Sequence, residues 1–248
     1  MLRVLLPFPR KADERYQLQF PTLAAAAATR RHAYSQLAIT LDHLDLDLDH
    51  VLGAGHYGLV TLGRFCGPRR HPAWSWLPTG DSRVAVKTVK SGDEATVMQF
   101  MMESRVLAAV SHAHIVRLLA VQEREAPMVL VMEYCSGGDL RSLLRRSGGE
   151  GQSDLGIDLS QLSSIACCLD MCQQVAGAVD YLHGFLCVHR DIAARNVLVA
   201  RDTAGLSRCG LLLKLADVGL TRGLLETADY YKVGGYREPV LRCSRPPL

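Results

Sequence analysis

The sequence predicts an α+β fold in which a small β-sheet precedes a mainly helical part. Two observations carry this prediction. Leucine and aspartate alternate strictly from Leu44 to Asp49, which is typical of a half-buried strand. Between Ser160 and His183, apolar residues recur with the period of one helical face, and this is the strongest helical signal in the chain. The 248 residues are enough for one large domain or two small lobes.

Composition and charge narrow the function classes. Apolar residues make up 48% of the chain, which permits a sizeable core, and the formal net charge is +3. Like charges never run longer than two arginines, so a nucleic-acid partner is not expected. Eight cysteines without a CxxC pair indicate reduced thiols and a cytoplasmic location. No apolar run reaches the roughly 20 residues that a membrane-spanning helix needs.

The first part of the chain is expected to contain five strands and one helix. Residues Gly53–Gly58 separate two alternating stretches, so they are expected to turn a hairpin. The helix is expected to carry Val97, Met101, Ser104 and Ala108 on one side. The loop that holds Trp74 and Trp76 is expected to be an exposed insertion. The strands are predicted at 44–49, 60–62, 84–89, 115–121 and 128–132, with the helix starting near Ser91 or Asp93.

The second part is expected to be helical apart from three short strands. A linker at 135–138 leads into a short helix over 139–146, and the long helix follows over 160–183. The short strands are predicted at 186–188, 197–199 and 211–216. We therefore divide the chain into a flexible extension (1–43), a sheet part (44–133) and a helical part (134–248).

The segment from His189 to Asn196 carries the most informative chemistry. It places the carboxylate of Asp191, the guanidinium of Arg195 and the amide of Asn196 within six residues. These groups are suited to accept a proton from an attacking hydroxyl, to hold a phosphate oxygen and to ligate a metal. Together they predict phosphoryl transfer, in which catalysis depends on positioning and charge neutralisation.

A glycine-rich loop and one lysine add to this prediction. Gly53, Gly55 and Gly58 form a GxGxxG pattern, which binds dinucleotides when a helix follows its last glycine. Here a strand follows instead, so the loop is expected to fold over phosphates as a hairpin. On the strand at 84–89, small Ala85 leaves room for an adenine ring, and Lys87 on the same face can reach phosphates. An ordinary glycine hairpin and a solvated lysine are the competing interpretations.

Taken in order, these motifs resemble the protein kinase family. The string His189–Asn196 is similar to its catalytic loop, and Ala193-Ala194-Arg195 to its tyrosine-specific branch. Asp217-Val218-Gly219 resembles the metal-binding triplet. Residues 226–235 are similar to the activation loop of insulin-receptor-like and neurotrophin-receptor-like kinases. The resemblance implies a two-lobed fold, with a five-stranded N-lobe (44–133) over an incomplete helical C-lobe (134–248).

The resemblance also implies a role for each residue of the site. Asp191 becomes the catalytic base and Arg195 a further catalytic residue. Glu103 pairs with Lys87, although Glu103 taken alone is typical of a surface helix acid. Asn196 and Asp217 would hold Mg²⁺. Phosphate on the autophosphorylation sites would pair with Arg190, and those sites are Tyr230 and Tyr231. The residues implied in ATP binding are Gly53, Gly55, Gly58, Val60, Ala85, Lys87, Met132, Glu133, Cys135 and Asp139.

The implied function is a protein tyrosine kinase that transfers the γ-phosphoryl group of ATP to protein tyrosine with Mg²⁺. The implied partners are ATP and protein tyrosine substrates, together with a second copy for trans-autophosphorylation. Contact with a membrane is expected only through a parent receptor. One alternative is a catalytically impaired kinase that binds nucleotide or acts as a scaffold. Another is a Rossmann-type oxidoreductase, which the strand after Gly58 argues against.

The chain departs from the family pattern in two places that matter. Val218 stands where the family carries phenylalanine, and the smaller side chain is expected to leave a gap that costs about 1–3 kcal/mol. After Arg242 the resemblance is lost, so we expect a chain truncated in the activation segment. In that case the helix at 160–183 would expose an apolar stripe.

Overall fold

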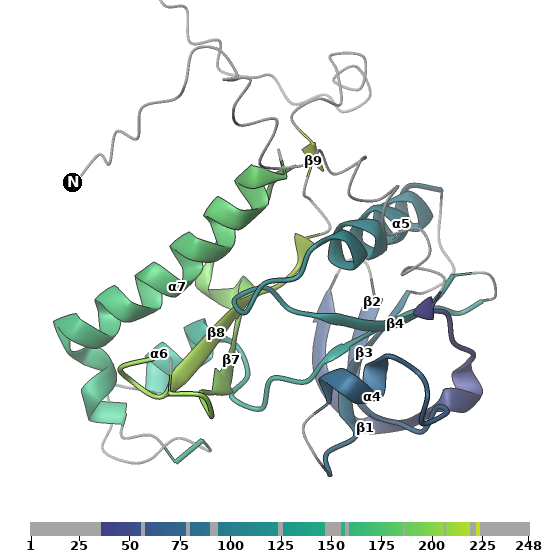
Figure 1. The fold of residues 1–248 in the computed structure, drawn as a ribbon, viewed down its shortest axis with the longest axis horizontal. Helices are drawn as coiled ribbons and strands as arrows, with labels where there is room; N and C mark the ends of the chain where they lie inside the picture. Colours follow the sequence, from purple (N-terminus) through teal and green to yellow (C-terminus); the bar gives the residue numbers. More distant parts are fainter. Residues whose placement is uncertain are drawn as a thin grey trace, which may run out of the picture.

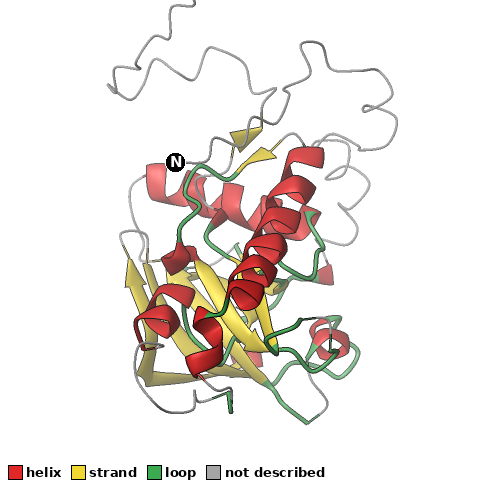
Figure 2. Ribbon diagram, turned by 90° about the vertical axis from the view of Figure 1, so that its left-hand side faces the viewer, coloured by secondary structure: helices red, strands yellow, loops and turns green. Residues whose placement is uncertain are grey.

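A computed structural model describes residues 36–223 apart from 56–57, 78–79, 90–93, 124–125, 147–154, 157–158, 186, 206 and 219–221. Two parts lie side by side: a five-stranded antiparallel sheet with α5, and a helical part dominated by α7 (Figure 1). Seen from the side of α7, the five-stranded sheet lies behind that helix (Figure 2). The predicted α+β fold class is confirmed. None of the helices in the described part of the chain has the length and apolar character that a bilayer crossing requires.

The sheet has the strand order β1-β2-β3-β5-β4, and each neighbouring pair is antiparallel. The predicted hairpin joins β1 to β2. The strand predicted at 115–121 begins later, because Ile115 instead bridges to Leu215 in the helical part. Ile39, which precedes the predicted start of the sheet part, donates its N–H to the Val121 carbonyl at 3.0 Å. The strands are β1 Leu44–Gly55, β2 Gly58–Phe65, β3 Arg83–Val89, β4 Leu118–Gln122 and β5 Met128–Glu133.

Alternation along β3 separates the two faces of the sheet. Val84 and Val86 are buried on one face, and Ala85, Lys87 and Val89 point to the other. Helix α5, Glu94–Ala109, covers the face that carries Ala85 and Val89, where Phe100 and Leu107 join the core. The expected apolar side of α5 is confirmed in part, because Met101 and Ala108 pack against the core and Ser104 is buried. Val97 is 36% exposed, whereas Phe100, Glu103 and Leu107 are buried.

The loop between β2 and β3 covers the opposite face and is not an exposed insertion. It contains a short helix, α4, Ala73–Trp76. Ala73 is fully buried, and Trp74 packs against the cluster that holds Phe65, Val84 and Val86. The ring centroids of Trp74 and Phe65 lie 5.4 Å apart. The prediction of an exposed insertion is wrong, because Trp74 supplies apolar surface that packs against the sheet even though prolines surround it in the sequence.

The helical part is built around α7, Ile165–Gly184, which begins at the N-cap Ser164. The Ser164 hydroxyl accepts a hydrogen bond from the Cys167 N–H at 3.2 Å, as a helix N-cap does. The remaining elements are η1 Leu41–His43, α6 Leu140–Arg146, η2 Leu159–Ser163, β6 Cys187–Val188, η3 Ala194–Asn196, β7 Val197–Arg201, β8 Leu211–Leu215 and β9 Arg222–Gly223. Strands β7 and β8 pair antiparallel, and β6 pairs with β9.

Helix α7 turns only part of its apolar surface inward. Met171, Gln174, Ala178 and Leu182 are buried, but Ile165 and Leu169 are 80% and 64% exposed. The expectation of an exposed apolar stripe on this helix is therefore confirmed. The side chain of Gln174 explains the choice of face. It donates to the Leu211 carbonyl at 3.0 Å and accepts from the Leu213 N–H at 2.8 Å, so it satisfies backbone groups of β8.

Candidate active site

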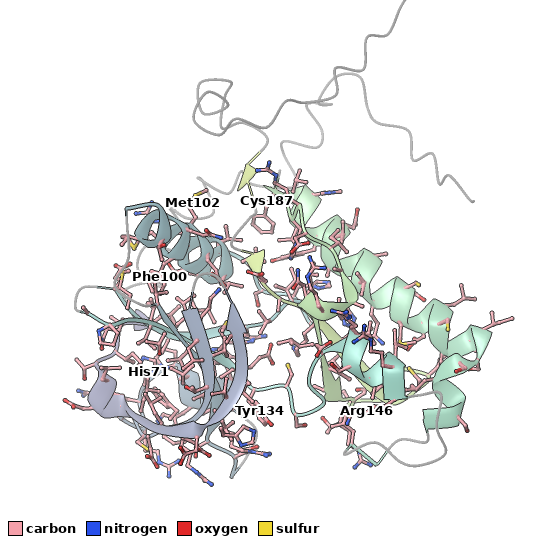
Figure 3. The ribbon with its side chains drawn as sticks, turned by 180° about the vertical axis from the view of Figure 1, so that it is seen from behind. His71, Phe100, Met102, Tyr134, Arg146 and Cys187 are labelled. Carbon is pink, nitrogen blue, oxygen red and sulfur yellow. The ribbon has the colours of Figure 1, made fainter. Side chains whose placement is uncertain are left out.

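The connection between the sheet and the helical part frames the site. Residue Tyr134 lies on this connection, which runs from the end of β5 to α6 (Figure 3). The Gly137 N–H donates to the Val199 carbonyl at 2.9 Å, and the Val199 N–H donates to the Gly138 carbonyl at 2.8 Å. A Cβ atom at Gly137 would lie 2.8 Å from the Val199 carbonyl oxygen, so glycine lets the linker approach β7 closely. The linker is thus held against the strand that follows the His189–Asn196 segment.

Five of the residues implied in ATP binding lie close together on the sheet. Val60 is the cross-strand partner of Lys87, and Ala85 is the partner of Met132. Directly opposed residues in an antiparallel sheet share a face, so these four side chains line the face that α5 covers. The fifth, Gly58, faces Thr88, where a Cβ would lie 2.4 Å from the Thr88 carbonyl oxygen. Only glycine fits at that position of the hairpin.

Lys87 and Glu103 form a short, shielded ion pair. The Lys87 Nζ lies 2.7 Å from Glu103 Oε2 and 2.9 Å from Oε1. Their side chains are 13% and 5% exposed. Burial raises the pKa of the Glu103 carboxyl, the Lys87 ammonium opposes that rise, and Asp217 adds to it. The interpretation of Glu103 as a surface acid is therefore wrong, because its side chain is buried against Lys87.

The His189–Asn196 segment orients the Asp191 carboxylate. Asn196 Nδ2 donates to Asp191 Oδ2 at 2.9 Å and to the Asp191 carbonyl at 2.8 Å. The Arg195 guanidinium pairs with Asp191 Oδ1. The hydrogen bond from Asn196 lowers the pKa of Asp191 most, and the Arg195 guanidinium lowers it further. Burial opposes both, but the pKa stays below its ordinary value. This carboxylate therefore stays ionised at neutral pH, as a proton acceptor must. The pairing of Arg195 with Asp191 was not predicted from the sequence.

His189 ties this segment to Asp217. Its side chain is almost fully buried, and its Nε2 donates to the Ala216 carbonyl at 3.0 Å. Burial lowers the pKa of His189, so the ring is neutral, with Nδ1 left to accept from the Asp191 N–H. The Ala216 N–H in turn donates to the Asn196 carbonyl at 2.8 Å. These bonds bring Asp217 next to Asn196.

Two residues of the site adopt left-handed backbone conformations. Arg190 has φ +72° and Asp217 has φ +58°, and no other non-glycine residue in the described ranges has a positive φ. Such conformations are sterically unfavourable for residues with a side chain, and they concentrate at functional sites. Arg190 directly precedes Asp191 in the chain. Asp217 follows Ala216, whose carbonyl accepts the hydrogen bond from His189.

Asn196 and Asp217 provide a donor set that fits Mg²⁺. Because Asn196 Nδ2 donates to Asp191, the Asn196 Oδ1 is directed elsewhere, and Asp217 supplies an exposed carboxylate. Mg²⁺ prefers such oxygen ligands and is usually held by one or two carboxylates together with substrate phosphates. No cluster of three His, Cys, Asp or Glu side chains suited to a metal occurs among the residues that the structure describes.

The remaining predicted residues have defined surroundings. The Glu133 N–H donates to the Arg117 carbonyl at 3.1 Å, so that group is not available to adenine. Cys135 is buried, and burial followed by the Glu133 charge raises its pKa to about 12. Asp139 caps α6 by accepting from the Ser142 N–H at 2.9 Å. Val218 is buried in the core, at 1% exposure. Tyr230 and Tyr231 lie outside the described residues.

One buried charge near the site was missed. Lys214, on β8, donates to the Ala113 carbonyl and lies 2.9 Å from Glu133 Oε1. The same Glu133 oxygen accepts from the Arg117 N–H at 2.8 Å. This contact links the strand before Asp217 to the end of β5. A single lysine between leucines of a buried strand was the signal that could have revealed it.

Comparisons with known proteins agree with this geometry. A family model described as protein tyrosine and serine/threonine kinase matches residues 46–243. The high affinity nerve growth factor receptor of Mus musculus is 34% identical over 82% of this chain and 24% of its own length. The tyrosine-protein kinase transforming protein ros of UR2 avian sarcoma virus is 36% identical over 77% of this chain and 44% of its own. The insulin-like growth factor 1 receptor of Xenopus laevis is 32% identical over 77% of this chain and 13% of its own length. The chain thus spans less than half the length of these relatives.

Proposed function

Because this chain belongs to the protein tyrosine and serine/threonine kinase family, we propose that it transfers the γ-phosphoryl group of ATP to protein tyrosine. The orientation of Asp191 carries this proposal. Its carboxylate is ionised, partly exposed and held from two sides by Arg195 and Asn196. An incoming tyrosine hydroxyl needs an acceptor of this kind for its proton, as its oxygen bonds to the γ-phosphorus and the bond from that phosphorus to the leaving ADP breaks.

The nucleotide is assigned to the face of the sheet that carries Lys87. The Lys87 ammonium, fixed by Glu103, binds the α- and β-phosphates, and the hairpin between β1 and β2 covers them with backbone N–H groups. Ala85 and Met132 bound the adenine site, and Asp139 lies near enough in sequence to the linker to serve the ribose. Asn196 and Asp217 would hold Mg²⁺, which would supply charge neutralisation for the transferred group.

The tyrosine preference rests on the residues after Asp191. Ala193 and Ala194 have small side chains, and Arg195 folds back onto the Asp191 carboxylate. The tyrosine hydroxyl lies at the end of a ring, farther from its backbone than a serine hydroxyl. Small side chains beside Asp191 leave room for that ring as the hydroxyl approaches the carboxylate. The relatives whose names include tyrosine kinase support this choice.

Regulation and location follow as parts of the same proposal. Tyr230 and Tyr231 are autophosphorylation sites, and the exposed Arg190 is the residue that pairs with their phosphates. Several relatives are named as receptors, so we place the catalytic domain on the cytoplasmic side of a membrane, where two copies phosphorylate one another.

The test is phosphotransfer to a tyrosine peptide, followed by phosphotyrosine detection, with ATP and Mg²⁺. We expect turnover by the chain and a loss of at least about 10²-fold in Asp191→Asn. Asp180→Asn, an exposed carboxylate on α7, is the matched control and should retain activity. ATP binding is measured in parallel. Nucleotide binding without any transfer by the folded wild-type chain would refute the catalytic proposal and favour a binding module.

A further inference from the structure

The segment between β2 and β3, residues 66–82, is named the β2–β3 insert, and its described residues 66–77 and 80–82 include the short helix α4. Trp74 Nε1 donates to the Gly67 carbonyl at 2.9 Å, and the Ala73 N–H donates to His71 Nδ1 at 3.1 Å. With Ala73 buried against the sheet, the insert has its own internal hydrogen bonds and a fixed position. His71 marks this unit on the side of the sheet part away from α7 (Figure 3).

The exposed side chains of the insert include two arginines and an indole, and guanidinium groups lie over both of its tryptophan rings. Trp76 is 53% exposed, and the Arg117 guanidinium lies 3.9 Å from its ring centroid. Arg69 lies over the Trp74 ring at 4.3 Å, and Arg69 and Arg70 are both exposed. Asp81, the single acidic residue in the sequence of the insert, is paired with Arg83 at 2.7 Å. The insert therefore offers positive charge next to apolar ring surface.

We propose that the β2–β3 insert docks the sheet part onto an anionic lipid surface. Indole rings favour the membrane–water interface, where one part of the ring is wet and another is apolar. Arginines beside such a ring are attracted by anionic headgroups. An acidic peptide would satisfy Arg69 and Arg70 but would leave the Trp76 ring in water. The half-exposed indole is the observation that favours the lipid surface.

The position of the insert is compatible with catalysis on a membrane. The insert covers the face of Val84 and Val86, whereas Lys87 points to the opposite face. Docking through Arg69, Arg70 and Trp76 therefore leaves the proposed nucleotide site open. The inference does not depend on the proposed phosphotransfer, since lipid binding is measured without ATP.

The test is co-sedimentation of the full chain with vesicles of phosphatidylcholine and phosphatidylserine in equal parts, and with vesicles of phosphatidylcholine alone. We expect binding to the anionic vesicles and a blue shift of tryptophan emission that is lost in Trp76→Phe. Each arginine near an anionic surface contributes about fivefold in partitioning, so Arg69→Gln with Arg70→Gln should lower it about 25-fold. High salt should weaken the binding, since it screens the charges.

The matched control is Arg145→Gln with Arg208→Gln, which removes the same charge from exposed positions outside the insert. Because it changes only the net charge of the chain, this control should lower partitioning by less than about twofold. Circular dichroism checks the fold of each variant, and the arginine pair keeps the test valid if the Trp76 variant unfolds. Equal binding by the insert and control variants would overturn the proposal. Binding of a polyglutamate peptide in place of vesicles would also overturn it.

Discussion

Replacing Glu103 by glutamine separates the positioning of Lys87 from the stability of the fold. The carboxylate is 5% exposed and lies 2.7 Å from Lys87 Nζ. Glutamine keeps the shape and one oxygen acceptor but removes the charge that holds the ammonium. We expect kcat/KM to fall about 10²-fold, which is near the lower end of the loss seen when a preorganised donor to the transition state is removed.

The stability of Glu103→Gln should change much less. Breaking a buried ion pair by removing one partner costs about 3–5 kcal/mol when the other charge remains buried. Here Lys87 is 13% exposed, keeps a hydrogen-bond acceptor, and loses a partner whose pKa burial had already raised. We therefore expect a loss of about 1–2 kcal/mol in the free energy of unfolding.

Lys87→Met is the complementary variant, because it leaves the Glu103 carboxyl buried without a cation. The pKa of Glu103 then rises further, so the folded state holds that proton more tightly than the unfolded state. Stability is highest below the ordinary glutamate pKa of about 4.3 and is lost as the pH rises through the raised value. Adding Glu103→Gln to Lys87→Met should remove this pH dependence.

Three measurements decide the question: kcat/KM on a tyrosine peptide, the dissociation constant of ATP, and urea unfolding from pH 4 to pH 8. The reasoning would be refuted if Glu103→Gln kept its kcat/KM within about twofold of the wild-type value. It would also be refuted if the stability of Lys87→Met did not change across that pH range.

Four further predictions concern the helical part and the thiols. Gln174→Ala leaves two buried backbone groups of β8 unpaired, so urea unfolding should show a loss of about 2–4 kcal/mol, and a loss under about 1 kcal/mol would contradict this role. Iodoacetamide at pH 8 should label exposed Cys66 but not buried Cys135, whose pKa is raised to about 12, and equal labelling would argue against that burial. Burial tends to raise the pKa of Asp170, but hydrogen bonds lower it below its ordinary value. Wild type should therefore be more stable than Asp170→Asn at pH 7, and this advantage should be lost as the pH falls through the lowered pKa. A stability difference that stays constant with pH would disprove the assignment. Leu169→Ser should leave stability within about 0.5 kcal/mol and reduce self-association in sedimentation velocity, because this side chain is 64% exposed, and a large loss of stability would show that it is buried.

The sheet and its site face could be predicted because strand patterns have a period of two. The alternation at 44–49 and at 84–89 already separates the faces, and it places Ala85 and Lys87 together. The register of β1 against β2 then follows from the glycine hairpin, which makes Gly53 the partner of Val60. In this part of the chain, local pattern and tertiary packing demand the same arrangement.

The buried face of each helix could not be predicted to the same degree. The apolar residues of α7 occupy more than one side, so periodicity alone does not say which side packs. Leu169 is exposed while Gln174 is buried, because β8 presents backbone groups that an amide satisfies and a leucine does not. In α5, Glu103 is buried because Lys87 faces it from another element, which no local pattern reveals.

Contacts between distant segments account for the remaining differences. The Lys214–Glu133 pair joins residues on β8 and β5, and the sequence shows only a lysine within an apolar strand. The pairing of Arg195 with Asp191 depends on the turn formed by η3. Asp139 lies at the start of α6, where capping its N-terminus is as natural for an aspartate as contacting a ribose.

The most direct test follows the γ-phosphoryl group itself. The chain is incubated with Mg²⁺ and ATP labelled in that group, together with a peptide that contains one tyrosine and one serine. If Asp191 accepts the phenol proton while the phosphoryl group passes from ATP to the tyrosine oxygen, the label appears on tyrosine and not on serine. Label found on serine, or released only as inorganic phosphate, would contradict the assignment of Asp191 as the base for tyrosine phosphorylation.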